Sequence, residues 1–600
     1  MKAKTDLISP HEAQTLAGLF RCRVEHSPDT KAYLHYDREA RQWQSTTWAE
    51  MAAHVSRWQT AMKREGLEPG DRVAVMLHNC REWVMFDQAA LGLGLVTVPL
   101  YADDHPENVA YILKDAGVRL LIVERAEQWE GIAATMPLPA IERVVSLRWV
   151  DAERYSGQLT SLNIWLPQRA TELQSHRADP DALATIVYTS GTTGRSKGVM
   201  LSHTNILFDA AAGLKQVPVY SDDLFLSFLP LSHTLERTAG YIIPMMTGAT
   251  VAYARSIQEL AEDLQSVRPT ILVTVPRIFE RVYNKLKDQL AAKPPMARRL
   301  FELAVEVGWE RFLRQQHRGS WNPMQLLWPI LKGVIASKVT AKLGGRLRMA
   351  VSGGAPLSPA VARVFIGLGL PVVQGYGLTE SSPVISVNRL EDNVPDSVGT
   401  LLPGVEARTS DEGELWVRGP NVMMGYWNCP EATAEILDSE GWLHTGDKVK
   451  LDEGGHIQIT GRLKEIMVLS NGEKLPPGDL EQAITMDSLF EQVMVIGEGR
   501  PFLAALVVLN REKFAELLQQ MGYRGEMEEA LKEKSVRQRA QERIEQQMSH
   551  FPGYAHIYRV HLDLEPWSIE NGLLTPTMKS RRSRILDHYA EEIEQLYAGH

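Results

Sequence analysis

The chain has 600 residues, more than one hydrophobic core usually supports, because cores stop growing at about 250–300 residues. Its 44% hydrophobic and 23% charged residues are ordinary for a globular protein and argue against long disordered tracts, collagen-like repeats and coiled coils. The net charge of −10 argues against general nucleic-acid binding, and three cysteines are too few for a disulfide framework. We therefore expect a cytoplasmic, multidomain enzyme-sized protein.

Strand-like and helix-like segments alternate along most of the chain. Residues 47–63 and 106–116 have helical patterns, whereas residues 72–77 (RVAVML) and 182–188 (ALATIVY) have the composition of buried strands. This alternation predicts an α/β fold with parallel sheets.

The last ~140 residues look separately built and are within ordinary domain size. A strand pair is expected at residues 492–496 and 503–509, followed by charged helices between residues 511 and 547. We place the boundary close to Gly461, with an N-terminal domain of residues 1–461 and a C-terminal domain of residues 462–600.

Membrane signals are weak. The N-terminus lacks the apolar core of a signal peptide, and the apolar run at residues 89–100 is too short to span a bilayer. Residues 321–335 carry two Trp residues with Lys nearby and could lie in a membrane interface. A helix packed on the protein's own core is the favoured alternative.

The strongest motif is YTSGTTGRSKG, residues 188–198, directly after a buried strand. Its glycines and hydroxyls can wrap a polyphosphate, and Lys197 adds a positive charge. It is not a Walker A loop, because Ser196 precedes Lys197 and Gly198 follows it. A strand at residues 199–201 and a helix capped by Ser202 or Thr204 should follow.

This loop resembles the phosphate loop of the adenylate-forming (AMP-binding) enzymes, in which Pro usually stands at the position of Ser196. We therefore expect a somewhat looser loop here. The resemblance assigns nucleotide binding to Thr189, Ser190, Gly191, Thr192, Thr193, Gly194 and Lys197.

The motif QGYGLTE, residues 374–380, offers a second set of nucleotide-binding groups. Its glycines let the backbone approach a flat ligand, Tyr376 can stack on adenine, Thr379 can donate to a phosphate, and Glu380 supplies a hard oxygen for Mg²⁺. The resemblance implies the same roles, with Thr189 as a second metal position. In this motif and in three other segments of the chain, the resemblance assigns nucleotide binding to Gly353, Gly354, Ala355, Gln374, Gly375, Tyr376, Gly377, Thr379, Asp447, Arg462 and Lys464.

Residues 449–459 form a predicted β-hairpin around the turn DEGG. Pairing Leu451 with Ile457 keeps the apolar residues on one face and places Asp447 opposite Gly461, so that Asp447 and Arg462 emerge together. An acid there suits ribose hydroxyls; a plain surface ion pair is the alternative.

Two catalytic positions rest on the resemblance alone. The segment LPLSHTLER, residues 229–237, is similar to the one in which a His closes the acyl-binding side, here His233. The segment LTPTMK, residues 574–579, is similar to the one with the catalytic lysine, here Lys579. Thr379 and Glu380 complete the implied catalytic set.

Residues 229–241, 274–283 and 574–579 are most similar to the long-chain fatty acyl-CoA synthetase branch. The resemblance implies a large N-terminal domain of α/β sheets layered with helices, a small barrel-like β subdomain, and a mobile α+β C-terminal domain that swings at Lys464. The implied reaction uses ATP, Mg²⁺ and CoA to convert a long-chain fatty acid to an acyl-adenylate and then to acyl-CoA.

Alternatives to this reaction are a fatty acyl-AMP ligase that serves a carrier protein, and a non-catalytic acyl- or nucleotide-binding scaffold. No insertion is evident between Glu380 and the hinge, which counts against the first, and the intact motif residues count against the second. A homodimer and peripheral contact with the inner face of a membrane stay open. The basic residues Arg581, Arg582 and Arg584 could meet CoA phosphates, although a solvated surface is the favoured interpretation.

Overall fold

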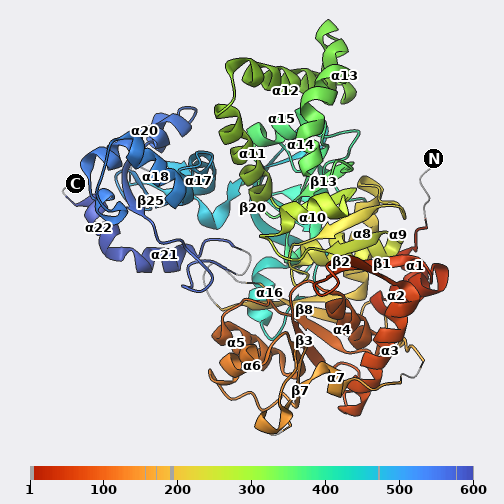
Figure 1. The fold of residues 1–600 in the computed structure, drawn as a ribbon. Coiled ribbons are helices and arrows are strands. Elements are labelled where there is room, and N and C mark those ends of the chain that lie inside the picture. The colour runs from red at the N-terminus through yellow and green to blue at the C-terminus, as the bar shows by residue number, and fades with distance from the viewer. Residues whose placement is uncertain are drawn as a thin grey trace.

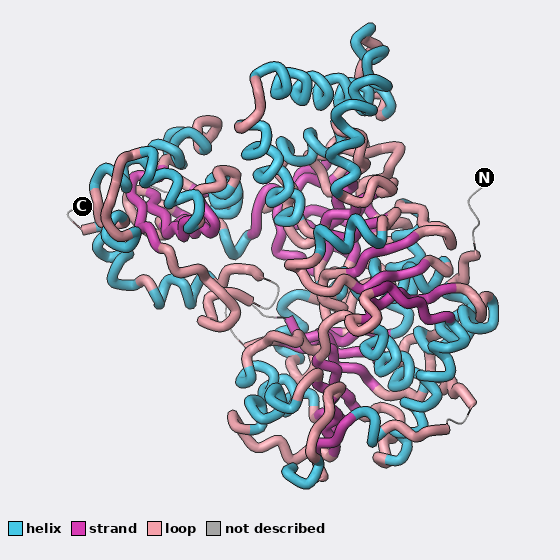
Figure 2. The backbone as a smooth tube through the Cα atoms, viewed as in Figure 1, coloured by secondary structure: helices cyan, strands magenta, loops and turns pink. Residues whose placement is uncertain are grey.

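The computed structural model describes residues 6–155, 157–169, 172–189, 195–470, 473–575 and 578–598. Two large sheets run through the N-terminal domain with helices on both sides, and the C-terminal domain lies beside them (Figures 1 and 2). The predicted α/β fold is confirmed. No helix in the described part of the chain is both long and apolar enough to span a membrane.

The first large sheet has nine strands, parallel from β14 to β1. Its order is β16 (Thr400–Leu401), β15 (Val384–Val387), β14 (Val372–Gly377), β13 (Met349–Ser352), β12 (Ile271–Thr274), β10 (Leu224–Ser227), β11 (Thr250–Tyr253), β1 (Lys31–Asp37) and β2 (Gln42–Thr47). The second has eight strands, parallel from β8 to β7. Its order is β19 (Gly425–Tyr426), β9 (Lys197–Ser202), β8 (Leu183–Thr189), β4 (Val96–Pro99), β3 (Arg72–Met76), β5 (Val118–Val123), β6 (Arg143–Ser146) and β7 (Leu159–Ser161).

Alternation along the strands explains the layers. In β3, Val73 and Val75 join the central core between the two sheets, whereas Ala74 and Met76 join a core on the outer face. Strands that are buried on both faces read as continuous apolar runs, which is why this pattern predicted parallel strands. The central core includes α2 (Leu16–His26), α3 (Trp48–Arg64), α4 (Arg81–Gly92) and α8 (His203–Gln216); the outer cores include α5 (Pro106–Ala116) and α6 (Ala126–Ala133) on one side, and α10 (Leu260–Val267), α11 (Pro276–Ala291) and α15 (Pro359–Gly367) on the other.

The expected barrel-like subdomain is instead an open antiparallel sheet of four strands. Its order is β17 (Glu406–Thr409), β18 (Glu414–Arg418), β20 (Leu443–Leu451) and β21 (Ile457–Arg462). The pairing of Leu451 with Ile457 is confirmed, but Asp447 pairs with Arg462 and not with Gly461. A register shift between Lys448 and Val449 causes the difference, and the side-chain alternation carries no sign of it.

The C-terminal domain has its own cores on the two faces of a three-stranded sheet, β24 (Phe490–Ile496), β25 (Leu503–Leu509) and β26 (Ile557–Asp563). The predicted strand pair and the helices after it are confirmed. Its remaining elements are β22 (Met467–Val468), β23 (Lys474–Leu475), α17 (Pro477–Thr485), α18 (Arg511–Gln520), α19 (Met527–Ala530), α20 (Lys534–Gln547), α21 (Arg582–His588) and α22 (Ala590–Tyr597). The other helices of the N-terminal domain are α1 (Pro10–Ala13), α7 (Leu162–Trp165), α9 (Ile243–Thr247), α12 (Pro295–Gln315), α13 (Trp328–Leu331), α14 (Ser337–Lys342) and α16 (Pro430–Ile436).

Candidate functional site

The glycine-rich motif joins β8 to β9, and its two ends are held in register. Thr189 at the end of β8 pairs with Lys197 at the start of β9, and Ser202 caps α8 by accepting from the Asn205 N–H. Ser190, Gly191, Thr192, Thr193 and Gly194 lie outside the described residues. The predicted strands and capped helix are therefore present on both sides of these residues.

Ser196 has a hydrogen-bond partner outside the loop. Its side chain is buried, and its hydroxyl donates to Asn108 Oδ1 of α5 over 3.1 Å. Local sequence patterns do not predict this partner, because Asn108 is 88 positions away in the sequence.

Tyr426 of β19 links two of the expected site residues. Its phenol donates to Glu380 Oε1 over 2.7 Å, and Lys197 Nζ lies 5.1 Å from the centre of its ring. Burial and the Glu380 charge raise the pKa of the phenol, so it stays a hydrogen-bond donor. Tyr426 is not among the predicted site residues; the available signal was the motif GYW at residues 425–427, which contains the short strand β19 that pairs with β9.

Asp447 is held by two partners. Tyr376 Oη donates to Asp447 Oδ2 over 2.6 Å, and Arg462 Nε donates to Asp447 Oδ1 over 2.7 Å. Asp447 is buried, whereas Arg462 keeps 41% of its side chain exposed. Burial, with the Asp447 charge, raises the pKa of Tyr376 well above its ordinary value. The predicted meeting of Asp447 and Arg462 is thus present, with Tyr376 as a third member.

Lys579 comes from the C-terminal domain to the same place. The Thr575 N–H donates to the Lys579 carbonyl over 2.8 Å, which closes the turn that carries the lysine. The side chain keeps an exposed surface, yet protein surrounds it at longer range; this environment and the Arg462 charge lower the pKa of its ammonium group. The charges of Asp447 and Glu380 oppose that shift.

His233, in the N-terminal domain, lies within range of the charge of the same lysine. Burial, with the Lys579 charge, lowers the pKa of His233 to about 4, so the imidazole is neutral at physiological pH. Its Nδ1 accepts from the Leu235 N–H over 3.2 Å, which places the ring proton on Nε2. Gly353 lies against this segment, because a Cβ there would sit 3.2 Å from Leu235 Cδ2.

Gln374 braces the site from behind. Its Oε1 accepts from the Leu357 N–H over 3.0 Å and its Nε2 donates to the Pro395 carbonyl over 2.5 Å. Its side chain therefore fixes the segment after Gly353, Gly354 and Ala355. Gly375 and Gly377 belong to β14, Thr379 lies in the short helical turn after it, and Lys464 follows β21.

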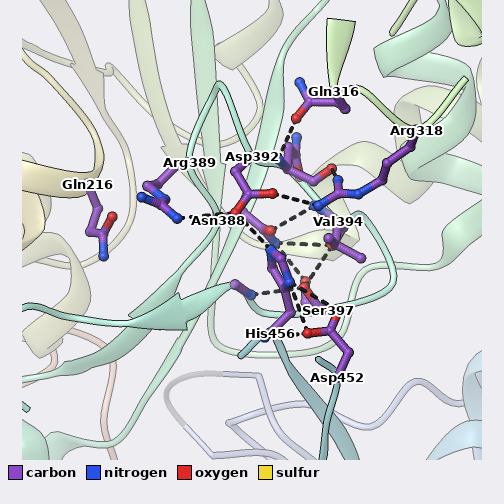
Figure 3. Close-up of polar contacts among 12 residues, drawn as sticks. Gln216, Gln316, Arg318, Asn388, Arg389, Asp392, Val394, Ser397, Asp452 and His456 are labelled. Atoms are coloured by element: carbon purple, nitrogen blue, oxygen red, sulfur yellow. Dashed lines mark hydrogen bonds and ion pairs between the residues drawn. The ribbon is translucent and has the colours of Figure 1, made fainter. Parts of the chain in front are cut away.

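A polar network supports the loop that Gln374 reaches (Figure 3). Asp392 pairs with Arg318 Nη2 over 2.6 Å and with His456 Nε2 over 3.2 Å, while His456 Nδ1 faces Asp452 Oδ2 at 3.1 Å. The network joins the end of α12, the loop after β15 and the β20–β21 hairpin. It therefore ties the loop after β15 to the β20–β21 hairpin, whose first strand contains Asp447.

The oxygen donors suit Mg²⁺ bound together with a polyphosphate. Glu380 offers a carboxylate and Thr189 and Thr379 offer hydroxyls, which are hard ligands. The described residues contain no cluster of three His, Cys, Asp or Glu side chains that could cage an ion alone. The carboxylate and hydroxyl oxygens named above fit an ion that takes the rest of its coordination from substrate phosphates and water.

Comparisons with known proteins agree with this geometry. Residues 20–427 match the AMP-binding enzyme family, and residues 464–600 match the AMP-binding enzyme C-terminal domain. The long-chain-fatty-acid–CoA ligase FadD15 of Mycobacterium bovis is 31% identical over 96% of both chains. The peroxisomal long chain acyl-CoA synthetase 7 of Arabidopsis thaliana is 30% identical over all of this chain and 89% of its own.

Among solved structures, the A-PCP didomain of a carboxylic acid reductase from Segniliparus rugosus, in complex with AMP, has a TM-score of 0.76 at 21% identity, over 97% of this chain and 82% of its own. The anthranilate CoA ligase AuaEII, in complex with anthranoyl-AMP, has a TM-score of 0.71 at 19% identity, over 96% of this chain and 97% of its own. These two likenesses concern the fold. The matched family models and the relatives at about 30% identity show that this chain belongs to the adenylate-forming, AMP-binding enzyme family, in its acyl-CoA synthetase branch.

Proposed function

We propose that this protein is a long-chain-fatty-acid–CoA ligase that forms an acyl-adenylate from ATP and then transfers the acyl group to CoA. The observation that carries the proposal is the contact of Asp447 with Arg462 over 2.7 Å, with Lys579 close enough for the charges of Arg462, Asp447 and Glu380 to act on it. Relatives of about 30% identity over nearly the whole chain have the same activity in their names.

In the first half-reaction the fatty carboxylate attacks the α-phosphorus and pyrophosphate leaves, so anionic groups must be brought together. Lys579 and Lys197 supply positive charge for this step, and Asp447 accepts from the ribose hydroxyls. Mg²⁺, held by Glu380 and Thr189, would neutralise charge on the phosphates. Neutral His233 closes the acyl side without adding a charge.

In the second half-reaction the CoA thiolate attacks the acyl carbon and AMP leaves. We place the domain boundary at residues 461 and 462, with Lys464 as the hinge. Separate cores on either side of this point support the boundary, since the C-terminal core begins at Met467. Rotation at the hinge would withdraw Lys579 once the adenylate has formed.

Product analysis by mass spectrometry tests the function. The purified protein is incubated with Mg-ATP and C4 to C18 fatty acids, with and without CoA. Long-chain acyl-CoA and AMP should appear together only when CoA is present. Acyl-adenylate that accumulates even when CoA is present would identify an acyl-AMP ligase. The absence of product with every acid would contradict the proposal.

A surface over α13 supports peripheral contact with a membrane. Six side chains here are each at least 43% exposed, and we call them the apolar crest: Trp321, Met324, Leu326, Leu327, Ile330 and Val334. Residues 311–348 contain eight Arg and Lys and no Asp or Glu. Arg318 and Arg348 pair with aspartates elsewhere, which leaves six basic residues with no acidic partner among the described residues.

An apolar face with basic flanks and an interfacial Trp suits an anionic lipid surface. A symmetric homodimer through the crest would bring two basic segments together, so we favour lipid over a second copy at this face. The alternative expectation, a helix packed on the protein's own core, also holds in part, because Trp328 and Leu331 are buried. The segment thus packs on the core through one face and exposes the other.

A further inference from the structure

The first turn of α5 lies between the two catalytic segments. Asn108 contacts Ser196, near the end of the glycine-rich motif, and His105 contacts the C-terminal domain ten residues before Lys579. None of the motifs that identify the family includes this turn. Its contacts suggest a role in the reaction that those motifs do not assign.

A continuous chain of hydrogen bonds runs through the turn. Ser196 Oγ donates to Asn108 Oδ1 over 3.1 Å, and Asn108 Nδ2 donates to Asp104 Oδ2 over 2.5 Å. The other oxygen of Asp104 accepts from the His105 N–H over 2.8 Å. Asn108 uses both ends of its amide, so an apolar residue of the same size would leave Asp104 and Ser196 without these partners.

The same turn contacts the C-terminal domain. His105 Nε2 donates to the carbonyl of Ile569, which also accepts from the Gly572 N–H and so belongs to the turn before the lysine segment. The positive charge of Arg581 acts on Asp104 from that side. Asp104 is only 8% exposed, and burial raises its pKa, an effect that Asn108, the His105 N–H and Arg581 each oppose.

We infer that Asp104, His105, Asn108 and Ser196 are positioning residues that set the root of the phosphate loop and the Lys579 segment in register for adenylate formation. The inference rests on the proposed function. The Ser196–Asn108–Asp104 bonds lie within the N-terminal domain and persist in both half-reactions. The His105–Ile569 bond joins the two domains and must break when the C-terminal domain rotates. Loss of this bond should therefore affect the first half-reaction alone.

The test measures the two half-reactions separately in the full-length enzyme. Pyrophosphate release from Mg-ATP and palmitate reports adenylation, and acyl-CoA formation from supplied palmitoyl-adenylate reports transfer. We expect His105→Ala to slow adenylation ~3–10-fold, which corresponds to the loss of one hydrogen bond. The transfer rate should stay within about twofold of the wild-type rate. His105→Gln keeps an N–H donor and should recover most of the rate. Lys114→Gln, an exposed position on the same helix, is the matched control.

Ser196→Ala should raise the KM for ATP ~3–10-fold with a smaller change in kcat, because it frees the root of the loop without touching the lysine segment. Asn108→Leu should combine both defects. If Asn108→Leu fails to fold, His105→Ala and Ser196→Ala still decide the question. Equal loss of both half-reactions in His105→Ala, or wild-type rates in both variants, would overturn the inference. An inactive wild-type enzyme would instead reject the proposed function.

Discussion

The phenol of Tyr426 and the carboxylate of Glu380 are 2.7 Å apart, and the ring of the same tyrosine lies 5.1 Å from Lys197 Nζ. One side chain thus orients the expected metal ligand with its hydroxyl and the expected phosphate-binding lysine with its ring. The three residues come from β9, β19 and the turn after β14, so Tyr426 also ties the two large sheets together at the site.

Tyr426→Phe should separate these two functions. The variant keeps the ring beside Lys197 but removes the hydrogen bond to Glu380, so we expect adenylation to fall ~10-fold with the apparent Mg²⁺ requirement raised. Tyr426→Leu removes the ring as well and should also raise the KM for ATP, since cation–π contacts stabilise by ~0.5–2 kcal/mol. Pyrophosphate release as a function of Mg²⁺ and ATP concentration checks both expectations. A Mg²⁺ response identical to wild type in Tyr426→Phe would remove Tyr426 from the site.

Lys579→Ala should lose adenylation by ~10²–10³-fold, the usual consequence of removing one charge-stabilising donor. It should retain CoA transfer from supplied acyl-adenylate, because the proposed rotation withdraws Lys579 before that step. Lys532→Ala, at an exposed position between α19 and α20, serves as a control for charge loss. Equal loss in both half-reactions would reject the division of labour.

The sequence was sufficient for features that depend on neighbouring residues. Strands such as β3 and the helix capped by Ser202 follow from local patterns, and so does most of the β20–β21 register. The predicted pairing was wrong at Asp447, because a register shift interrupts the side-chain alternation from which the pairing was predicted.

Contacts between distant segments could not be predicted. Arg237 is buried and donates to Asp87 over 2.6 Å and to Thr185 over 2.7 Å, which joins three elements far apart in the chain. Nothing in the segment LPLSHTLER distinguishes this buried arginine from a surface one. The partnerships of Tyr426 with Glu380 and of Ser196 with Asn108 are of the same kind, since they exist only once the sheets are assembled.

Glu236 should make the stability of the protein depend on pH. It is 1% exposed, and burial raises its pKa from 4.5 to about 8, although the Ser227 hydroxyl donates to it. Between these two pH values the folded protein keeps a proton that the unfolded chain has released, so stability falls as the pH rises.

Glu236→Gln stays neutral and should remove this dependence. We expect little difference from wild type near pH 4.5 and a gain of ~3–5 kcal/mol in the free energy of unfolding above pH 8, at 1.36 kcal/mol per pKa unit. Urea unfolding at pH 5, 7 and 9 measures the free energy of unfolding of both proteins, and Glu453→Gln, at an exposed position, is the control. A gain of the same size at every pH would show that packing, and not ionisation, is responsible.

Membrane contact should depend on the apolar crest. Leu326 and Ile330 are 71% and 65% exposed, so the double variant Leu326→Asp, Ile330→Asp should fold normally and lose flotation with vesicles that contain phosphatidylglycerol. Wild-type binding should weaken in high salt, because the six basic residues act through screened charges. Trp149→Asp, at a position 74% exposed outside the crest, is the matched control. Trp328 is unsuitable for this purpose because it packs against Gly308 and Gly369 in the core. Retention of binding by the double variant, or its loss in the control alone, would place the membrane contact elsewhere on the protein.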